Sequence, residues 1–195
     1  MHTKPIALMV GLAVCLFVAR ALAEDKTELK VGDPAPVFQC QDDQGKTWNS
    51  ADVVGKKVLV VYFYPADMTG GCTKQACGFR DDARKLEEKG VVVVGVSGDT
   101  VKNHQIFKEV HKLPFTLLAD PDGAVAAKFG VPFAKGQKDV KTRDAAGNEV
   151  VLTRGGTAQR WTFVIGKDGK IMHKNTKPNA AEDSKKILEL VGGKS

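Results

Sequence analysis

The sequence is poor in the features that define several large classes of protein. It contains 4 cysteines among 195 residues, which are too few for a scaffold held together by disulfides. It shows no internal repeat and no low-complexity tract, and a long apolar run occurs only within its first 23 residues. Hydrophobic residues make up 43% and charged residues 27%, which excludes a disordered chain, a collagen-like fibre and a polytopic membrane protein. The length suits one globular domain.

Several catalytic and binding motifs are also absent. The chain has no Walker loop, no dinucleotide fingerprint, no Ser–His–acid arrangement and no Cys-x-x-Cys pair. Its formal charge of +6 is modest, and basic residues alternate with acidic ones, as they do in residues 85–89. Aromatic residues make up 7% and are not interleaved with the basic ones, so no nucleic-acid partner is expected.

The first 23 residues have the layout of a secretory signal peptide. Lys4 precedes an apolar stretch over residues 6–19, and Ala21-Leu22-Ala23 supplies a small-residue cleavage site. The apolar stretch is shorter than the roughly 20 residues that a membrane-spanning helix needs. An uncleaved anchor and acylation at Cys15 are the alternatives, and the large residue before Cys15 disfavours the second.

Cleavage after Ala23 leaves a single domain over residues 24–195. Loss of Lys4 and Arg20 lowers the formal charge from +6 to +4. We therefore expect an exported protein, periplasmic or secreted, with no stable membrane association once the leader is removed.

Two apolar runs flank an amphipathic segment. Residues 58–64 and 91–96 are rich in β-branched and aromatic side chains, which predicts strands buried on both faces of a parallel sheet. The segment between them, residues 73–89, is predicted to be a helix that Gly90 ends. Residues with helical spacing form its inward stripe: Cys72, Ala76, Phe79, Ala83 and Leu86. Charged residues form its outer face: Lys74, Arg80, Asp81, Asp82, Arg84 and Lys85.

Strand, helix and strand in this order begin a thioredoxin-like α/β fold, in which helices flank a central mixed β-sheet. Thr100 is expected to cap a helix that runs to about residue 112, with Ile106, Phe107 and Val110 facing inward. Residues 134–158 are polar and glycine-rich, which predicts a loop or hairpin excursion. The other predicted elements are strands at 115–119, 161–165 and 171–173, a short helix at 124–129 and a final helix at 180–191.

Cys72 lies at the junction of the first buried strand and the amphipathic helix. The unpaired N–H groups at a helix start carry roughly half a positive charge, which stabilises a thiolate. Because the thiolate is the reactive form of cysteine, Cys72 is a candidate nucleophile. The alternative is a structural cysteine on the inward stripe of the helix.

The residues that precede Cys72 favour the reactive alternative. The hydroxyl of Thr69 can hydrogen-bond a ligand that approaches Cys72. Gly70 and Gly71 allow close approach to the backbone, and Pro65 ends the strand where the chain turns.

The pattern Pro65-x-x-x-Thr69-x-x-Cys72 resembles the active-site motif of the peroxiredoxins. With Cys77 followed by the residues GFRD at 78–81, the chain is similar to the bacterioferritin comigratory protein (PrxQ) subgroup of the AhpC/TSA family. The resemblance extends along the chain after the leader, and includes residues 31–36, 118–123 and 160–165.

The resemblance implies a thioredoxin-dependent peroxidase without cofactor or metal, acting as a monomer. Cys72 would be the peroxidatic cysteine, which attacks hydrogen peroxide or an organic hydroperoxide and becomes a sulfenic acid. Thr69 and the backbone N–H groups of Gly71 and Cys72 would bind the peroxide, and Arg160 would stabilise the thiolate and the polarised oxygens. Cys77 would resolve the sulfenic acid as a Cys72–Cys77 disulfide, which a thioredoxin-like reductant would reduce.

Two positions depart from the usual motif. Gly70 stands where relatives commonly have proline, and Met68 stands where an acid is frequent. These differences affect the expected rate and peroxide preference more than the reaction, and a methionine beside an oxidant is itself oxidisable.

Helix geometry restricts the pairing of the two cysteines. Five residues apart on an ideal helix, two Cα atoms are ~8–9 Å apart. A disulfide tolerates at most ~7 Å between Cα atoms, so Cys72 and Cys77 can bond only if the first turn or more unwinds. The alternative for Cys77 is an ordinary residue on the helix surface.

Two other function classes stay open at this point. An extracytoplasmic thiol–disulfide oxidoreductase usually carries Cys-x-x-Cys, which is absent here. A copper-binding thioredoxin-like protein more commonly has Cys-x3-Cys with a distal histidine, and Met68 and His173 keep this class open. Cys40 is expected to be a small, half-buried residue that a Cys72–Cys77 bond leaves unpaired.

Overall fold

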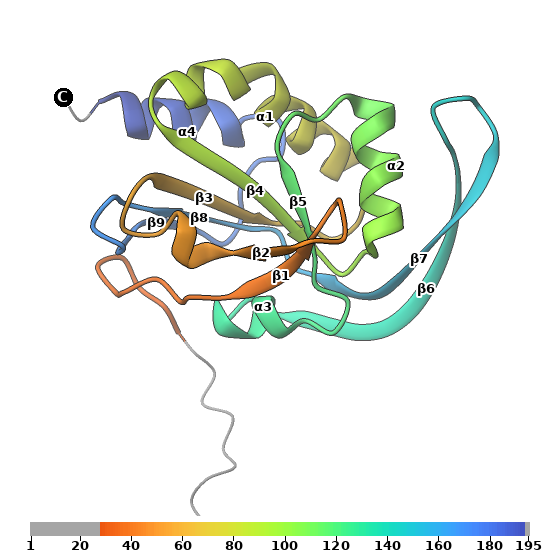
Figure 1. Cartoon of the computed structure of the whole chain (residues 1–195), viewed down its shortest axis with the longest axis horizontal. Helices are drawn as coiled ribbons and strands as arrows, with labels where there is room; N and C mark the ends of the chain where they lie inside the picture. Colours follow the sequence, from red (N-terminus) through yellow and green to blue (C-terminus); the bar gives the residue numbers. More distant parts are fainter. Residues whose placement is uncertain (1–27, 194–195) are drawn as a thin grey trace, which may run out of the picture.

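A seven-stranded mixed sheet forms the centre of the protein (Figure 1). The structure is a computed structural model and describes residues 28–193. The predicted signal peptide, with Cys15, lies outside the described residues. The strand order is β2-β1-β5-β4-β3-β8-β9; β3, β4 and β5 run parallel, and the other pairs are antiparallel. The strands are β1 (Gln39–Asp42), β2 (Thr47–Asn49), β3 (Val58–Phe63), β4 (Val91–Ser97), β5 (Thr116–Ala119), β8 (Trp161–Ile165) and β9 (Ile171–Asn175).

Helices cover both faces of this sheet (Figure 1). One face carries α1 (Gly70–Glu88), α2 (Val101–His111) and α4 (Asp183–Gly192), and the other carries α3 (Ala124–Lys128). A short 3-10 turn, η1 (Ser50–Asp52), follows β2. The thioredoxin-like layout predicted from the sequence is therefore confirmed.

The buried strand β3 explains why both faces must be covered. Leu59 and Phe63 pack in one core layer, whereas Val60 and Tyr62 pack in the other. Successive side chains of a strand point to opposite faces, so an unbroken apolar run requires a sheet buried on both sides. The neighbouring strand β4 continues the same pattern and pairs with β3 in parallel.

The excursion at residues 134–158 is a hairpin. Its strands β6 (Phe133–Arg143) and β7 (Glu149–Ala158) form a separate two-stranded antiparallel sheet whose outer end projects from the body (Figure 1). At its base, the Gly155 N–H donates to the Gly98 carbonyl at 2.9 Å. A Cβ at Gly98 would lie 2.3 Å from the Gly156 carbonyl oxygen, so two backbones meet there at a distance that only glycine permits.

Most predicted elements are present, with differences at their ends. Helix α1 begins at Gly70, three residues before the predicted start, and α4 begins at Asp183 instead of residue 180. The capping role of Thr100 is confirmed, because its hydroxyl accepts the Asn103 N–H at 3.3 Å. Among the described residues, no helix has both the length and the apolar character needed to cross a membrane.

The inward faces of two helices differ from prediction. Asp82 was placed on the outer face of α1 but is only 9% exposed, because α4 packs over it and Ser184 donates its hydroxyl to the Asp82 carboxylate at 2.9 Å. Ala83, predicted inward, is half-buried.

In α2, Phe107 is buried as expected. Ile106 and Val110 are half-buried, because the helix instead turns Asn103 and His104 inward.

Candidate active site

Cys72 is the third residue of α1 and is 1% exposed. Its side chain packs in the core layer that lies between α1 and the sheet. It therefore meets both descriptions considered from the sequence, since it belongs to the inward stripe and also to the first turn of the helix. Among the described residues, Cys40, Cys72 and Cys77 are all free thiols.

Arg160 reaches Cys72 from the strand beside β3. Strand β8 pairs antiparallel with β3, and Trp161 is opposite Phe63. This register brings the residue before β8 next to the point where the chain leaves β3 for α1. The Nη2 group of Arg160 donates to the Sγ of Cys72 at 3.2 Å. A guanidinium is a cation with a planar fork of N–H donors, and a cation beside a cysteine sulfur is a common feature of reactive cysteines.

Gln75 and Asp183 hold Arg160 in this position. The Nη1 group of Arg160 donates to Oε1 of Gln75, and Nε2 of Gln75 donates to Oδ2 of Asp183 at 2.7 Å. Thr162 donates its hydroxyl to the same carboxylate oxygen at 2.7 Å. Burial raises the pKa of Asp183, although the bonds from Thr162 and Gln75 oppose this.

Neither Gln75 nor Asp183 was predicted from the sequence to belong to the site. Gln75 lies three residues after Cys72, and residues at this spacing share a helix face, so a signal for it was present. Asp183 is brought to Gln75 only by the packing of α4 on α1, and nothing in the sequence indicates that contact.

Gly71 leaves room for the guanidinium. A Cβ at position 71 would lie 3.3 Å from the Nη2 of Arg160, whereas a Cβ at Gly70 would meet no atom within 4 Å. Glycine at position 71 therefore lets Arg160 approach the start of α1 closely.

Thr69 is the N-cap residue of α1 and has an extended backbone. Its hydroxyl donates to the Ala66 carbonyl at 3.0 Å, and its own carbonyl accepts the Thr73 N–H at 2.8 Å. The N–H groups of Gly71 and Cys72 belong to the first turn, where a helix offers its own N–H groups no acceptor. This end of α1 can therefore receive an electronegative ligand.

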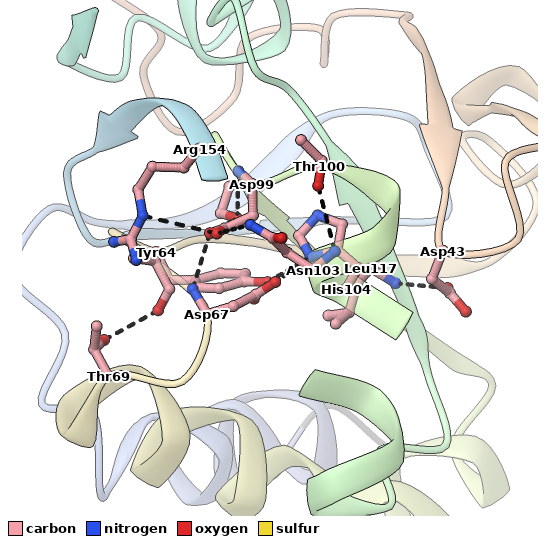
Figure 2. Close-up of polar contacts among 12 residues, drawn as sticks. Asp43, Tyr64, Asp67, Thr69, Asp99, Thr100, Asn103, His104, Leu117 and Arg154 are labelled. Atoms are coloured by element: carbon pink, nitrogen blue, oxygen red, sulfur yellow. Dashed lines mark hydrogen bonds and ion pairs between the residues drawn. The ribbon is translucent and has the colours of Figure 1, made fainter. Parts of the chain in front are cut away.

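The segment of residues 65–69 joins β3 to α1. Pro65 is half-buried and opens the segment, and Met68 has a φ of 58°, a left-handed conformation that is uncommon outside glycine. Buried Asp67 anchors it (Figure 2). The Asp67 carboxylate accepts the Tyr64 hydroxyl at 2.7 Å and lies 2.8 Å from Nδ1 of His104. Neither Asp67 nor His104 was predicted from the sequence to have a role at the site.

Cys77 lies in the same unbroken helix as Cys72 and is half-buried. The continuous helix supports the argument that the two thiols can pair only after α1 unwinds locally. The pairing itself stays a prediction.

Cys40 is half-buried in β1, as expected. Its Sγ donates to the Ala119 carbonyl at 2.8 Å. Burial, together with the charge of nearby Asp120, raises the pKa of Cys40 to about 12. This thiol is therefore a poor nucleophile in the folded protein.

The copper-binding alternative named Met68 and His173. Met68 lies in the segment before α1, whereas His173 lies in β9. Within residues 28–193, no three side chains of His, Cys, Asp or Glu gather as a metal site would require.

Comparison with known proteins gives consistent matches. The model of the AhpC/TSA family matches residues 31–174. A bcp-type peroxiredoxin of Coxiella burnetii is 43% identical over 143 residues, which are 73% of this chain and 85% of that protein. The chloroplastic peroxiredoxin Q of Sedum lineare is 48% identical over 101 residues, and the match spans 52% of this chain and 54% of that protein.

A solved structure agrees with these matches. The crystal structure of peroxidoxin BcpB from Mycobacterium tuberculosis superposes with a TM-score of 0.69 at 32% identity, and covers 86% of this chain and 99% of that one.

Proposed function

This chain belongs to the AhpC/TSA family, and we propose that it is a thiol-dependent peroxidase that reduces hydrogen peroxide and organic hydroperoxides with Cys72 as the nucleophile. The observation that carries the proposal is the 3.2 Å hydrogen bond from Arg160 to the Sγ of Cys72 in the first turn of α1. A helix start and a fixed cation converge on one thiol, which is the environment that activates cysteine.

In the first step, the Cys72 thiolate attacks the terminal oxygen of the hydroperoxide. An S–O bond forms and the O–O bond breaks, so the sulfur is oxidised by two electrons to the sulfenic acid and the peroxide is reduced. The leaving oxygen takes up a proton from water and departs as an alcohol or as water. Arg160 and the first-turn N–H groups stabilise the negative charge that moves from sulfur to oxygen, and Thr69 hydrogen-bonds the peroxide.

In the second step, the Cys77 thiol attacks the sulfur of the sulfenic acid. An S–S bond forms, the S–O bond breaks and water leaves. The first turn of α1 unwinds to bring the two sulfurs together. A dithiol reductant of the thioredoxin type then exchanges with the Cys72–Cys77 disulfide, so that both thiols are restored and the reductant is oxidised.

The proposal extends to the location of the protein. The signal-peptide pattern of residues 1–23 supports export to the periplasm or the medium, so the reductant would be an extracytoplasmic protein with a thioredoxin-like dithiol. A single copy of the chain carries all the named groups, which supports action as a monomer.

The test is peroxide consumption by the reduced protein without its leader, compared with Cys72→Ser and Cys77→Ser. We expect rapid consumption that Cys72→Ser abolishes. Without a reductant, the parent protein and Cys77→Ser should each consume one equivalent of peroxide; the parent should then contain the Cys72–Cys77 disulfide, whereas Cys77→Ser should gain the mass of one oxygen on Cys72. Slow consumption that Cys72→Ser leaves unchanged would overturn the proposal.

Cys40→Ser is the matched control for both cysteine variants. The same change is made at a half-buried thiol that Ala119 binds and that lies outside α1. It should leave both the rate and the disulfide unchanged, and a Cys40→Ser protein that fails to form the disulfide, as Cys77→Ser does, would remove the proposed role of Cys77.

A further inference from the structure

The segment of residues 65–69 carries Thr69 to the start of α1, yet it has no regular secondary structure. Met68 in this segment adopts a left-handed backbone, which is unfavourable in a residue other than glycine and persists only where neighbouring structure enforces it. Buried polar groups from four separate parts of the chain bind the neighbouring Asp67 or one another beside it.

Asp67 is the residue of the segment that these groups bind. Its carboxylate contacts the Tyr64 hydroxyl and His104, as described above, and its N–H donates to Oδ2 of Asp99 at 2.9 Å. Figure 2 shows these contacts beside the start of α1. The side chain and the backbone of Asp67 are thus both held, which leaves the residues on either side little freedom.

Asp99 extends these contacts to the hairpin. Its carboxylate lies 3.8 Å from Nε of Arg154, a residue of β7 that is 6% exposed. Asn103 donates one hydrogen bond to Asp99 at 2.9 Å and another to the Thr153 carbonyl at 2.8 Å. The base of the hairpin is therefore connected through Asp99 to the segment before α1.

The cluster contains two carboxylates, Asp67 and Asp99, with His104 and Arg154 as their cationic partners. All four are buried. Burying charges rarely adds stability compared with apolar packing, but removing one partner leaves an uncompensated charge and is costly. Such a cluster is therefore better explained by the geometry that it imposes than by the stability that it adds.

We propose that Asp99, His104 and Arg154 are positioning residues of the peroxidase reaction, which hold Asp67 and thereby fix Thr69 at the peroxide-binding start of α1. The hairpin β6–β7 supports the active site through Arg154. The proposal rests on the proposed function, because it assigns a support to that same site.

The charge of His104 gives the cluster a pH dependence. Burial opposes the protonated form, but the carboxylates of Asp67 and Asp99 outweigh it and raise the pKa of His104 above its usual range. Buried Tyr64 and Tyr62 also lie near Asp67, and burial raises the pKa of each tyrosine well above its usual value. Burial also raises the pKa of Asp67, although the charge of His104 opposes this. As His104 loses its proton, the two carboxylates keep only Arg154 as a cationic partner.

The test uses two reactions of the Cys72 thiolate, in the protein without residues 1–23 and with Cys40→Ser and Cys77→Ser, so that Cys72 is its only thiol. Reaction with hydrogen peroxide needs Thr69 in place, whereas alkylation by iodoacetamide needs the thiolate alone. The ratio of the two rate constants therefore reports positioning, and the ionised fraction of Cys72 cancels from it.

Asp99→Asn and Arg154→Met are the test variants. A displacement of about 1 Å at a reacting group can cost about 10²-fold in rate, and we expect the ratio to fall by roughly 10-fold or more in each variant. Arg154→Lys should recover part of the loss, because it restores the charge. A ratio equal to that of the parent overturns the proposal, even where the peroxide and alkylation rate constants both fall, because the two then fall in step.

Asp43→Asn is the matched control. Asp43 is also a buried carboxylate, 7% exposed. It accepts a backbone N–H from Leu117 at 3.1 Å and pairs with Lys108 of α2 at 2.6 Å, and neither bond involves the segment of residues 65–69. The ratio of the two rate constants in Asp43→Asn should equal that of the parent. If the ratio falls as far in Asp43→Asn as in Asp99→Asn, loss of any buried carboxylate lowers it, and the proposal is overturned.

If the variants do not fold, the pH dependence of the parent protein tests the proposal instead. Between about pH 6 and 10, the ratio of its peroxide rate constant to its alkylation rate constant should fall as His104 loses its proton. A ratio that does not change with pH overturns the proposal. Failure of the proposed function is seen separately, as a parent protein whose Cys72 reacts with peroxide no faster than free cysteine does.

Discussion

Cys72 is surrounded by groups from three parts of the chain. Its own helix supplies the first-turn N–H groups, the residue before β8 supplies a guanidinium at 3.2 Å, and Gln75 together with Asp183 orients that guanidinium. Electrostatic preorganisation of this kind acts without any reorganisation during the reaction. Single substitutions at these positions should therefore change rate more than stability.

Replacing Arg160 tests the contribution of the guanidinium. Loss of one preorganised donor typically costs about 10²–10³-fold in rate, and we expect a fall of this size in the peroxide rate constant of Arg160→Met. Arg160→Lys should recover only part of it, since lysine carries its N–H groups on a single nitrogen and lacks the planar fork whose two nitrogens bind Gln75 and Cys72. Arg80→Met is the control, because Arg80 in α1 binds Asp81 and the His111 carbonyl. An Arg160→Met protein with the parent rate would contradict the prediction.

Two neighbouring glycines offer a matched pair of substitutions. In Gly71→Ala the new Cβ lies 3.3 Å from the Nη2 of Arg160, so the guanidinium must shift by a few tenths of an ångström. In Gly70→Ala the new Cβ meets nothing within 4 Å. Stopped-flow measurement of peroxide reduction should show a several-fold lower rate constant for Gly71→Ala and a near-parent value for Gly70→Ala. The reverse order would show that space beside Arg160 does not limit the reaction.

Cys40 should be nearly inert in the folded protein. With a pKa of about 12 it is almost entirely protonated near neutral pH. Alkylation for a fixed time, followed by peptide mass analysis, should leave Cys40 unmodified in the native protein and label it fully in denaturant. Equal labelling of Cys40 in both states would contradict the burial and the hydrogen bond to Ala119.

At the scale of elements, α1 has two opposed requirements. Its first turn must be intact to present Cys72 to peroxide, and it must open for Cys77 to reach the sulfenic acid. The helix starts with two glycines, and Thr69 hydrogen-bonds Ala66 instead of capping it with its side chain. These features make the start of α1 the part of the helix that opens most easily, while Phe79 and Leu86 hold the remainder in the core.

Oxidation should therefore unwind α1 locally. Hydrogen exchange followed by mass spectrometry should show faster exchange in residues 70–77 of the disulfide form than in the reduced protein, with residues 79–88 still protected. Cys77→Ser treated with one equivalent of peroxide provides the control and should keep its protection. A Cys72–Cys77 disulfide in a fully protected helix would refute the need for unwinding.

At the scale of the whole molecule, the hairpin β6–β7 and the segment before α1 are connected through the buried charges of Asp99 and Arg154. The same cluster contains His104, so the stability of the fold should also depend on pH. Since the pKa of His104 is raised in the folded protein, its proton contributes stability that is fully present below the unfolded value of ~6.5 and is lost as pH rises through the folded pKa.

Urea unfolding of the parent and of His104→Gln tests this dependence. The difference in the free energy of unfolding between the two should shrink as pH rises from about 6 to 9, because only the parent loses the stabilising proton. His111, whose pKa burial and nearby Arg80 lower, is present in both proteins and cancels from the difference. A difference that grows with pH would mean that His104 is held neutral in the fold.

Local sequence by itself determined the elements and the candidate nucleophile of this protein. The unbroken apolar run at β3, the helical stripe of α1 and the position of Cys72 between them depend on spacing along a few consecutive residues, and the structure agrees with each. Arg160 was named only because its surroundings resemble those of a family. Nothing local distinguishes it from Arg154, six residues earlier, which the sequence analysis did not name.

Only the tertiary structure decided which polar residues surround Cys72 and the segment before it. Asp183 reaches Gln75 because α4 packs on α1, and Asp82 is buried for the same reason. Asp67, Asp99 and His104 meet because a parallel sheet brings the ends of β3 and β4 together beside α2. A buried charge is stable only where partners distant in the sequence surround it, and sequence periodicity carries no information about those partners.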